Sequence, residues 1–388
     1  MKSAACSGWL AYVGDREDLC DLNLPDTGNP FGAFAAACIA VGEVYKSVCG
    51  MRPDKGDMID SMCFSAYDLG RYLKPWGNLE NPPVYGPVDL GNLHVCGAGA
   101  VAHAFCQALL PMDGLDGNLF FIDQSTDPNN SDEKIETTNL ARYIMASNQD
   151  EGRDKARLLA DRMSANGIQT GFSDDGFEAY VNRANNVKLP HVVSCVDNNG
   201  ARHAIQDRIP KMIHGGSTSD LRSQVSVYDL GCDDCQCLKC YNPKKDAASD
   251  AEVYERLKNM PMEQRRALAV DRGMEPEVLE QHLQDLVCGT LGNESIQKFA
   301  EIDDAPEFSV NFVSALTGVL LAGEVVKSKS SRLRPALDGR RRVDASYAFF
   351  TNRCYLAPVK PKPACWCSTG KSTPRDVYKQ IWPAYSVD

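Results

Sequence analysis

The amino-acid sequence predicts an α/β protein whose core is a doubly wound, mostly parallel sheet. The first observation behind this prediction is a βαβ pattern over residues 91–125, in which two short apolar runs flank a glycine-rich turn and an alanine-rich helix. The second is an amphipathic helix from Lys155 to Met163, followed by an apolar strand from His191 to Val196. Strands that alternate with helices pair in parallel. Each crossover helix carries the chain back to the end of the sheet where the previous strand began, so the next strand runs in the same direction.

The composition agrees with such a fold and excludes several classes of function. With 388 residues, 43% of them hydrophobic, the chain can bury a large core and form two or three structural units. Its formal net charge of -11 argues against nonspecific binding to nucleic acids or membrane surfaces, both of which attract basic proteins. No apolar run is long enough to span a membrane and no apolar signal region follows Met1, so we expect a cytoplasmic protein.

The chain is expected to divide into four regions: residues 1–90, 91–241, 242–300 and 301–388. The third is a charged insertion with three predicted helices, Ala251 to Met260, Met262 to Asp271 and Pro276 to Leu286. The fourth returns to the sheet domain with an apolar helix from Ser309 to Lys327. Its basic, proline-rich stretch from Arg332 to Pro363 predicts an extended tail.

A short internal repeat links the first region to the last. Residues 30–47 and 312–328 are both small-residue, apolar segments, and both contain the pattern Gly-Glu-Val-x-Lys-Ser. Two buried helices explain the pattern. One interpretation is that residues 1–90 are a degenerate second copy of part of the fold, and the alternative is a coincidence between two alanine-rich helices.

The glycine-rich turn is a fingerprint for nucleotide binding. Gly97 and Gly99 follow a predicted strand, Ala102 takes the third position, and Asp123 ends a strand 24 positions after Gly99. Glycines permit close approach of the backbone to phosphates, and the helix that follows offers amide donors. Asp123 is placed to accept hydrogen bonds from ribose hydroxyls. The pattern predicts a Rossmann-like nucleotide site.

Four further polar residues narrow the choice of nucleotide, namely Asn139, Arg142, Lys155 and Asp197. They stand in the segments Asn-Leu-Ala-Arg, Gly-Arg-Asp-Lys and Asp-Asn, each near the end of a predicted element. In this order they resemble the adenylation domain that ThiF, MoeB and the ubiquitin-activating enzymes share. The resemblance covers residues 91–241. An NAD-dependent dehydrogenase would account for the glycines and Asp123 but not for these four residues.

The resemblance implies a role for each of these residues. Arg142 and Lys155 would bind the phosphates of ATP, Asp197 would bind or orient magnesium, and Asn139 would help to hold the nucleotide. The spacing from Asp123 departs from the family pattern, which indicates an insertion beside the ATP site over Asp127 to Glu136. The family often recruits a further arginine from a partner subunit, and no motif selects among the candidates Arg16, Arg52 and Arg71.

The cysteines predict a structural zinc site. The pattern CxxC at Cys237 and Cys240 is followed much later by CxC at Cys365 and Cys367, and four thiolates satisfy the tetrahedral preference of zinc. The resemblance implies the same four ligands, although the second cysteine pair of the family usually has a different spacing from CxC. Cys232 with Cys235 is an alternative first pair, and Cys354 is an alternative ligand.

Cys288 is the candidate catalytic nucleophile. It lies between the charged helices and the returning apolar helix, where the family carries its catalytic cysteine or crossover segment, and Gly289 and Gly292 after it indicate a loop. His282 lies upstream, where a surface position is the simpler interpretation. The leading hypothesis is therefore ATP-dependent adenylation of a ubiquitin-like protein, thioester formation on Cys288 and transfer to a conjugating enzyme, by a homodimer. The alternatives are a sulfur-carrier adenylyltransferase, a dehydrogenase and a non-catalytic nucleotide-fold scaffold.

Overall fold

The computed structural model of the chain forms two compact units, Met1–Pro243 with Ser309–Asp388, and Lys244–Phe308. It describes residues 2–20, 22, 24–25, 27–49, 58–84, 86–124, 134–164, 168–184, 188–219, 221–242, 257–271, 276, 280, 310–337, 344–357, 359–363, 365–368 and 373–383. In the smaller unit the described helix is α8 (Met262–Asp271). Its Arg265 donates hydrogen bonds to the carboxylate of Glu280 and to the carbonyl of Met260.

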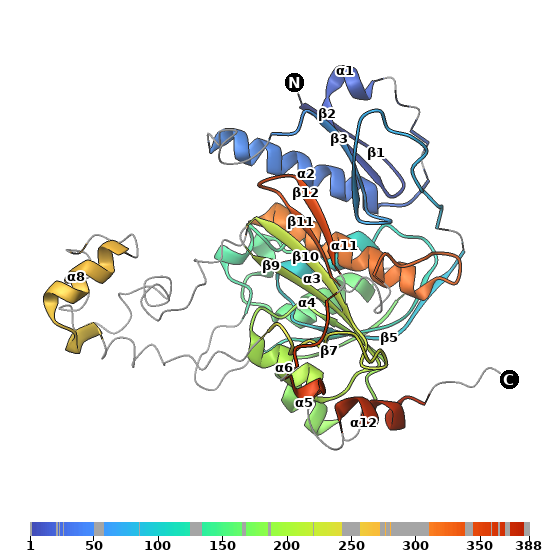
Figure 1. Cartoon of the computed structure of the whole chain (residues 1–388). Helices are drawn as coiled ribbons and strands as arrows, with labels where there is room; N and C mark the ends of the chain where they lie inside the picture. Colours follow the sequence, from blue (N-terminus) through green and yellow to red (C-terminus); the bar gives the residue numbers. More distant parts are fainter. Residues whose placement is uncertain are drawn as a thin grey trace. The chain divides into compact units, whose positions relative to one another are not determined.

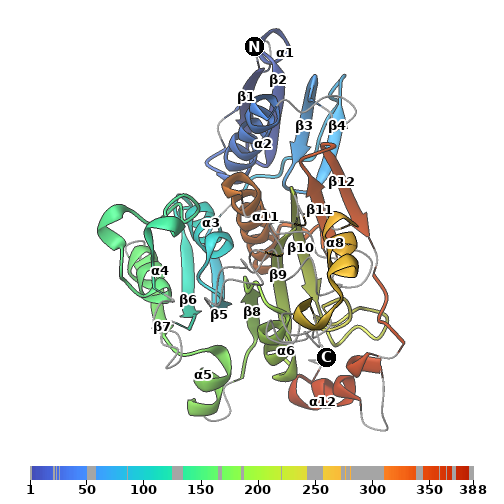
Figure 2. The ribbon, with the colours of Figure 1, turned by 90° about the vertical axis from the view of Figure 1, so that its left-hand side faces the viewer.

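An eight-stranded sheet crosses the larger unit in the order β12-β11-β10-β9-β8-β5-β6-β7 (Figure 2). The five strands from β9 to β7 are parallel, and the other three pair antiparallel. The strands are β5 (Val88–Cys96), β6 (Leu115–Ile122), β7 (Gln169–Ser173), β8 (His191–Ser194), β9 (Met212–Ser219), β10 (Arg222–Tyr228), β11 (Asp344–Ala348) and β12 (Arg353–Ala357). The prediction of a mostly parallel sheet is confirmed.

Helices cover both faces of this sheet. The described helices of the sheet domain are α3 (Ala100–Leu109), α4 (Lys155–Ser164), α5 (Phe177–Arg183), α6 (Asn199–Asp207), α11 (Asn311–Lys329) and α12 (Pro374–Ile381). Val193 of β8 packs in the core formed with α3, α4 and α11, whereas its neighbour Val192 packs in a second core with α5 and α6. This alternation is expected, because successive side chains of a strand point to opposite faces.

The prediction of an extended tail over Arg332 to Pro363 is wrong for the middle of that segment. Within residues 332–363 the chain forms the hairpin of β11 and β12, which completes the antiparallel edge of the sheet. The physical reason is an apolar alternation at Ala345, Tyr347 and Phe349, whose side chains are all buried. Tyr347 and Phe349 also meet edge to face, with ring centroids 4.9 Å apart.

The N-terminal region (Figure 1) is a smaller antiparallel sheet, and its strands follow the order β1-β2-β3-β4 (Figure 2). Its strands are β1 (Lys2–Ser7), β2 (Leu10–Asp15), β3 (Ser61–Ser65) and β4 (Gly70–Leu73), and its helices are α1 (Arg16–Leu19) and α2 (Phe31–Val48). Helix α2 packs along α11, and residues of both helices belong to one hydrophobic core. Among the described helices, α2 has the length and apolar composition of a membrane span, and half of that window is buried in the protein.

Two buried ion pairs lie in these two helices. Glu43 pairs with Lys46 in α2, and Glu324 pairs with Lys327 in α11. The Lys327 ammonium also donates to the carbonyl oxygens of Ala66 and Tyr67, in the turn between β3 and β4, at 3.1 and 2.5 Å. The Glu-x-x-Lys spacing of the sequence repeat thus places one buried charge pair in each helix, and the pair in α11 binds the backbone of the N-terminal sheet.

Buried histidines make the stability of this fold sensitive to acid. Burial lowers the pKa of His94 to about 4, of His103 to about 3 and of His214 to about 3, and it lowers the pKa of His191 well below 6.5. Because these folded-state values lie below that of the unfolded chain, each histidine stabilises the fold fully above about pH 6.5. As the pH falls from there towards about 4, each one costs about 1.4 kcal/mol of unfolding free energy per pH unit.

We therefore expect urea midpoints to fall steeply between pH 7.5 and pH 5.5. His94→Phe is the matched variant, because its ring lies beside Phe120 and Tyr180 and needs no proton. The variant should show a shallower pH dependence than the wild type. Equal unfolding free energies of the wild type at both pH values would contradict the prediction.

Candidate active site

The strand order creates a crevice at the carboxyl ends of β5 and β8. These strands are neighbours in the sheet, yet β5 leads through α3 to β6 on one side while β8 leads through α6 to β9 on the other. Such a reversal opens a gap outside the strand ends, and ligands of doubly wound folds bind there. The glycine-rich turn follows β5, and Asp197 follows β8.

Close packing at the end of β8 explains why the first position of the glycine-rich turn, Gly97, is a glycine. Gly97 has φ +87°, and a Cβ atom there would lie 2.8 Å from the carbonyl carbon of Cys195. The adjacent backbone is held by the N–H of Cys195, which donates to the carbonyl of Cys96 at 2.7 Å. Gly99 precedes the first residue of α3, where no side chain caps the helix. The backbone amides in the first turn of α3 therefore have no side-chain cap from Gly99, which is the arrangement that suits an anion.

Asp123 supports this loop from the neighbouring strand β6. Its Oδ2 accepts a hydrogen bond from the N–H of Ala98 at 2.9 Å. The carboxylate expected to bind a ribose thus lies against the glycine turn, as the fingerprint requires. The same carboxylate also holds the turn in its shape.

Asn139 organises the turn that carries Arg142. Its buried side chain accepts from the N–H of Glu136 at 3.0 Å, and its carbonyl accepts from the N–H groups of Arg142 and Tyr143. The ring of Tyr143 stacks on His103, one turn into α3, with centroids 4.5 Å apart. Asn139 is thereby a scaffold residue in this structure, and it brings Arg142 beside the first half of α3.

Lys155 is the first residue of α4, and an ion-pair network supports the segment before it. The buried carboxylate of Asp150 pairs with Arg153 at 2.9 Å and Arg162 at 3.0 Å, and it accepts from Ser147. Burial raises the pKa of Asp150, but the hydrogen bonds from Ser147 and the two arginines outweigh it and lower the pKa to about 2. The sequence interpretation missed this network, although Ser147 and Asp150 have the spacing of a capping box.

The insertion expected beside the site ends against the same segment. Of Asp127 to Glu136, the structure describes residues 134–136. The N–H of Ile135 donates to the carbonyl of Arg153, and its own carbonyl accepts from the N–H of Gly152. The end of the insertion therefore packs on the chain that leads into Lys155.

Asp197 is exposed at the end of β8, next to the N-terminus of α6. Asn198 caps that helix by accepting from the N–H of Ala201 at 2.7 Å. Arg202 donates to the carbonyl of Val196 at 3.1 Å and to the side chain of Asn242 at 3.2 Å. The arginine of the Asp-Asn-x-x-x-Arg pattern therefore fixes the strand end that presents Asp197.

A cavity of about 460 Å³ opens between the N-termini of α5 and α6. Its lining includes Gln124, Gly176, Glu178 and Asn198. Gln124 follows Asp123 and Asn198 follows Asp197, so the cavity adjoins both carboxylates along the chain. Its size is in the range of small-molecule sites. Sequence reasoning did not identify Gln124 or Glu178 as lining residues, because neither belongs to a motif.

The four predicted cysteine ligands meet in space. The Sγ atoms of Cys237, Cys240, Cys365 and Cys367 all lie within 4.8 Å of one another, with neighbouring pairs 3.6 to 3.8 Å apart. A tetrahedral metal bound by thiolates at about 2.3 Å needs sulfur atoms about 3.8 Å apart, so the arrangement fits a metal ion. Between the cysteines of each pair, Lys239 and Trp366 meet, with the Lys239 ammonium 4.5 Å from the centroid of the Trp366 ring.

The alternative ligands lie elsewhere. Cys232 and Cys235 are joined in a disulfide, which removes both thiols from metal binding. Cys354 is on β12 and packs against the main hydrophobic core. The CxxC and CxC pairs at the cluster meet because residues 359–363 return alongside the knuckle, where the N–H of Gln236 donates to the carbonyl of Val359. Cys288 and His282 lie outside the described residues.

Comparisons with known proteins relate the chain to one family. The model of the ThiF family matches residues 91–367. A protein of Sinorhizobium fredii (strain NBRC 101917 / NGR234), called "Uncharacterized protein y4jF", is 26% identical over 330 residues, which are 77% of this chain. The chain spans 60% of the length of that relative.

Several solved structures are also similar. E. coli MccB with AMPCPP and MccA is 12% identical, covers 71% of this chain and 66% of its own, and has a TM-score of 0.44. PaaA is 13% identical, with coverages of 69% and 72% and a TM-score of 0.40. MccB in complex with N-formylated MccA is 10% identical, with coverages of 95% and 98% and a TM-score of 0.43.

We expect the cysteine cluster to bind one metal ion per chain. Replacing one ligand by Cys240→Ser leaves three thiolates, so the metal content measured by mass spectrometry should fall to a small fraction of the wild-type value. Cys354→Ser is the matched control, because it removes a cysteine that the structure places outside the cluster. Equal metal content in Cys240→Ser and the wild type would contradict the assignment.

Proposed function

The chain belongs to the ThiF family, and from this membership and the crevice described above we propose that it activates a carboxylate by transferring AMP to it from ATP. A carboxylate oxygen of the substrate bonds to the α-phosphorus, the bond from that phosphorus to the oxygen that bridges it to the β-phosphate breaks, and pyrophosphate leaves with that oxygen. The observation that carries the proposal is the convergence of the glycine turn, Asp123 and Asp197 at the strand ends, beside the segments that bear Arg142 and Lys155.

The residues of the crevice divide this task. The turn at Gly97 and the start of α3 offer backbone amides to phosphates, and Asp123 accepts from ribose hydroxyls. Arg142 and Lys155 stabilise the negative charge that develops on the phosphates during transfer. Asp197, exposed at the end of β8, is the carboxylate that would hold magnesium, which neutralises charge on the phosphates when bound. In this proposal the cavity beside Gln124 receives the base.

The proposed substrate carboxylate is the C-terminus of a ubiquitin-like protein. Two observations support this choice. The ordered set of motifs resembles that of the enzymes that activate such proteins, and the net charge of -11 suits a protein or nucleotide partner better than nucleic acid. In this proposal Cys288 captures the acyl group as a thioester, AMP leaves, and a conjugating enzyme accepts the thioester. Zinc is the metal proposed for the four-cysteine cluster, where it would join the knuckle after β10 to the chain before α12.

Exchange of labelled pyrophosphate into ATP tests the adenylation step. With a glycine-terminated ubiquitin-like protein as substrate, Arg142→Ala and Lys155→Ala should each lower the exchange rate by about 100-fold, because each removes a charge that stabilises the transition state. Lys211→Ala is the matched control, since it removes an exposed lysine at the opposite end of the parallel strands. Full exchange in both site variants would contradict the assignment of the cations.

Thioester formation tests the role of Cys288 separately. The wild type and Cys20→Ser, which removes an exposed cysteine of the N-terminal region, should both form a thiol-sensitive adduct with the ubiquitin-like protein. Cys288→Ser should retain pyrophosphate exchange. It should form either no adduct or an ester that resists thiols. Exchange without any thioester in the wild type would favour a sulfur-carrier adenylyltransferase instead.

A further inference from the structure

Helix α2 has an apolar face that the described part of the chain leaves uncovered. Val41, Val44 and Val48 are 52%, 62% and 81% exposed, and Ala33 and Ala37 continue the same stripe towards the start of the helix. The spacing of three or four residues puts all five on one side. None carries a charge, whereas both charged residues of the helix, Glu43 and Lys46, are buried on the other side.

The N-terminal sheet repeats the edge of the main sheet element by element. The order β1-β2-α2-β3-β4 corresponds to β9-β10-α11-β11-β12. In one copy the N–H of Ala66 donates to the carbonyl of Trp9 at 2.9 Å, and in the other Phe349 donates to Leu221 at 2.8 Å. The last loop residue of the second hairpin has a positive φ in both, at Leu69 and Asn352.

The two helices meet in a reciprocal contact. A Cβ atom on Gly42 of α2 would lie 3.5 Å from Phe312 of α11, and one on Gly323 of α11 would lie 3.7 Å from Phe31 of α2. Gly42 corresponds to Gly323, and Phe31 corresponds to Phe312, in the sequence repeat. A contact in which each partner uses the same pair of positions is the mark of a two-fold arrangement.

The correspondence identifies what covers the equivalent face of α11. In α11 the positions equivalent to Ala37, Val41 and Val44 are Gly318, Ala322 and Val325, and all three are buried. Helix α3 packs against this part of α11 (Figure 2). The contact is so close that a Cβ on Gly318 would lie 2.5 Å from Cβ of Ala104. On α2 no described helix takes the place of α3. The face is thus built for a close-packed, uncharged helix.

We propose that a second copy of this chain covers the face, with α2 packed antiparallel on the α2 of its partner. Pairing about a centre between Ala40 and Val41 sets Ala33 against Val48, and Ala37 against Val44. Small residues then oppose larger ones along the whole contact, which lets the helix axes approach closely. Two copies of one neutral stripe bury apolar surface on both sides without stranding a charge.

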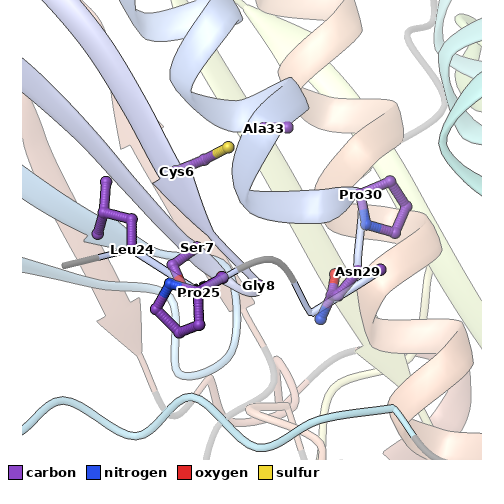
Figure 3. A pocket seen from close by; sticks show the side chains of 9 residues that line it. Cys6, Ser7, Gly8, Leu24, Pro25, Asn29, Pro30 and Ala33 are labelled. Atoms are coloured by element: carbon purple, nitrogen blue, oxygen red, sulfur yellow. Dashed lines mark hydrogen bonds between the residues drawn. The ribbon is translucent and has the colours of Figure 1, made fainter.

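The two ends of the stripe also fit each other. A pocket of about 410 Å³ lies beside the first turns of α2, lined by Cys6, Leu24, Pro25 and Ala33 among others (Figure 3). At the opposite end Val48 projects as the most exposed valine of the stripe. Antiparallel pairing brings Val48 of each copy to the pocket of the other, so one interface fills two pockets.

The oligomeric state of the full chain tests the proposal. Sedimentation equilibrium should give twice the 42.5 kDa mass of the chain. Val44→Glu and Ala37→Glu each bury a carboxylate in the contact and should give monomers, while circular dichroism stays unchanged because both positions are exposed in one copy. Leu73→Glu, on β4, is the control for an exposed apolar residue elsewhere and should remain dimeric. A monomeric wild type at 100 μM, or a dimer that persists in Val44→Glu, would overturn the proposal.

Native cysteines test the direction of the pairing. Cys49 follows Val48, and Cys6 lines the pocket, so a short bis-maleimide should join Cys49 of one copy to Cys6 of the other. Cys6→Ser and Cys49→Ser should each lose the cross-link, and an equimolar mixture of the two should regain it, because each supplies the thiol that the other lacks. No recovery in the mixture would overturn the antiparallel arrangement. Binding of the monomer to phosphatidylcholine vesicles, abolished by Val44→Glu, would assign the face to a membrane instead and would also overturn the proposal.

Discussion

The close approach of Gly97 to the end of β8 is the constraint on which the site depends. A side chain at this position would collide with the backbone at Cys195, so the turn after β5 can lie against β8 only with glycine. That contact brings the carboxyl ends of two strands together although they are nearly a hundred residues apart in the chain. The start of α3, Asp123 and Asp197 then share one crevice. The Ala98 to Asp123 hydrogen bond closes the arrangement on its other side.

The cations of the site depend on supports that contribute no charge to the crevice themselves. Arg142 is carried on a turn shaped by Asn139 and anchored by the stacking of Tyr143 on His103. Lys155 starts a helix whose approach is held by the carboxylate of Asp150. A long cationic side chain loses much conformational freedom when it binds a phosphate, so a fixed backbone lowers the cost of ordering it. The supports therefore matter for the proposed chemistry as much as the cations do.

The N-terminal sheet is joined to the main sheet through buried charges. Lys327 is fully buried, but its ammonium has the carboxylate of Glu324 and two carbonyl oxygens as partners, and it lies over the rings of Trp9 and Tyr67. Glu324 in turn accepts from the N–H of Leu337. A buried ion pair adds little net stability, yet a misplaced partner would leave a charge unsolvated. The pair thus favours one position of the N-terminal sheet over others.

The amino-acid sequence by itself determined the βαβ core, the order of the nucleotide motifs and the two repeated helices, because these depend on local periodicity and on residues close together in the chain. It also indicated the four cysteines of the cluster, since closely spaced cysteine pairs are typical of metal sites and two pairs supply the four thiolates of a tetrahedral site. Only the tertiary structure decided that Cys232 and Cys235 form a disulfide, that the tail forms β11 and β12, and that Asp150 anchors the segment before Lys155. The same holds for the bare face of α2. Each of these depends on which distant segment lies alongside, and pairing between distant segments leaves little trace in local sequence pattern.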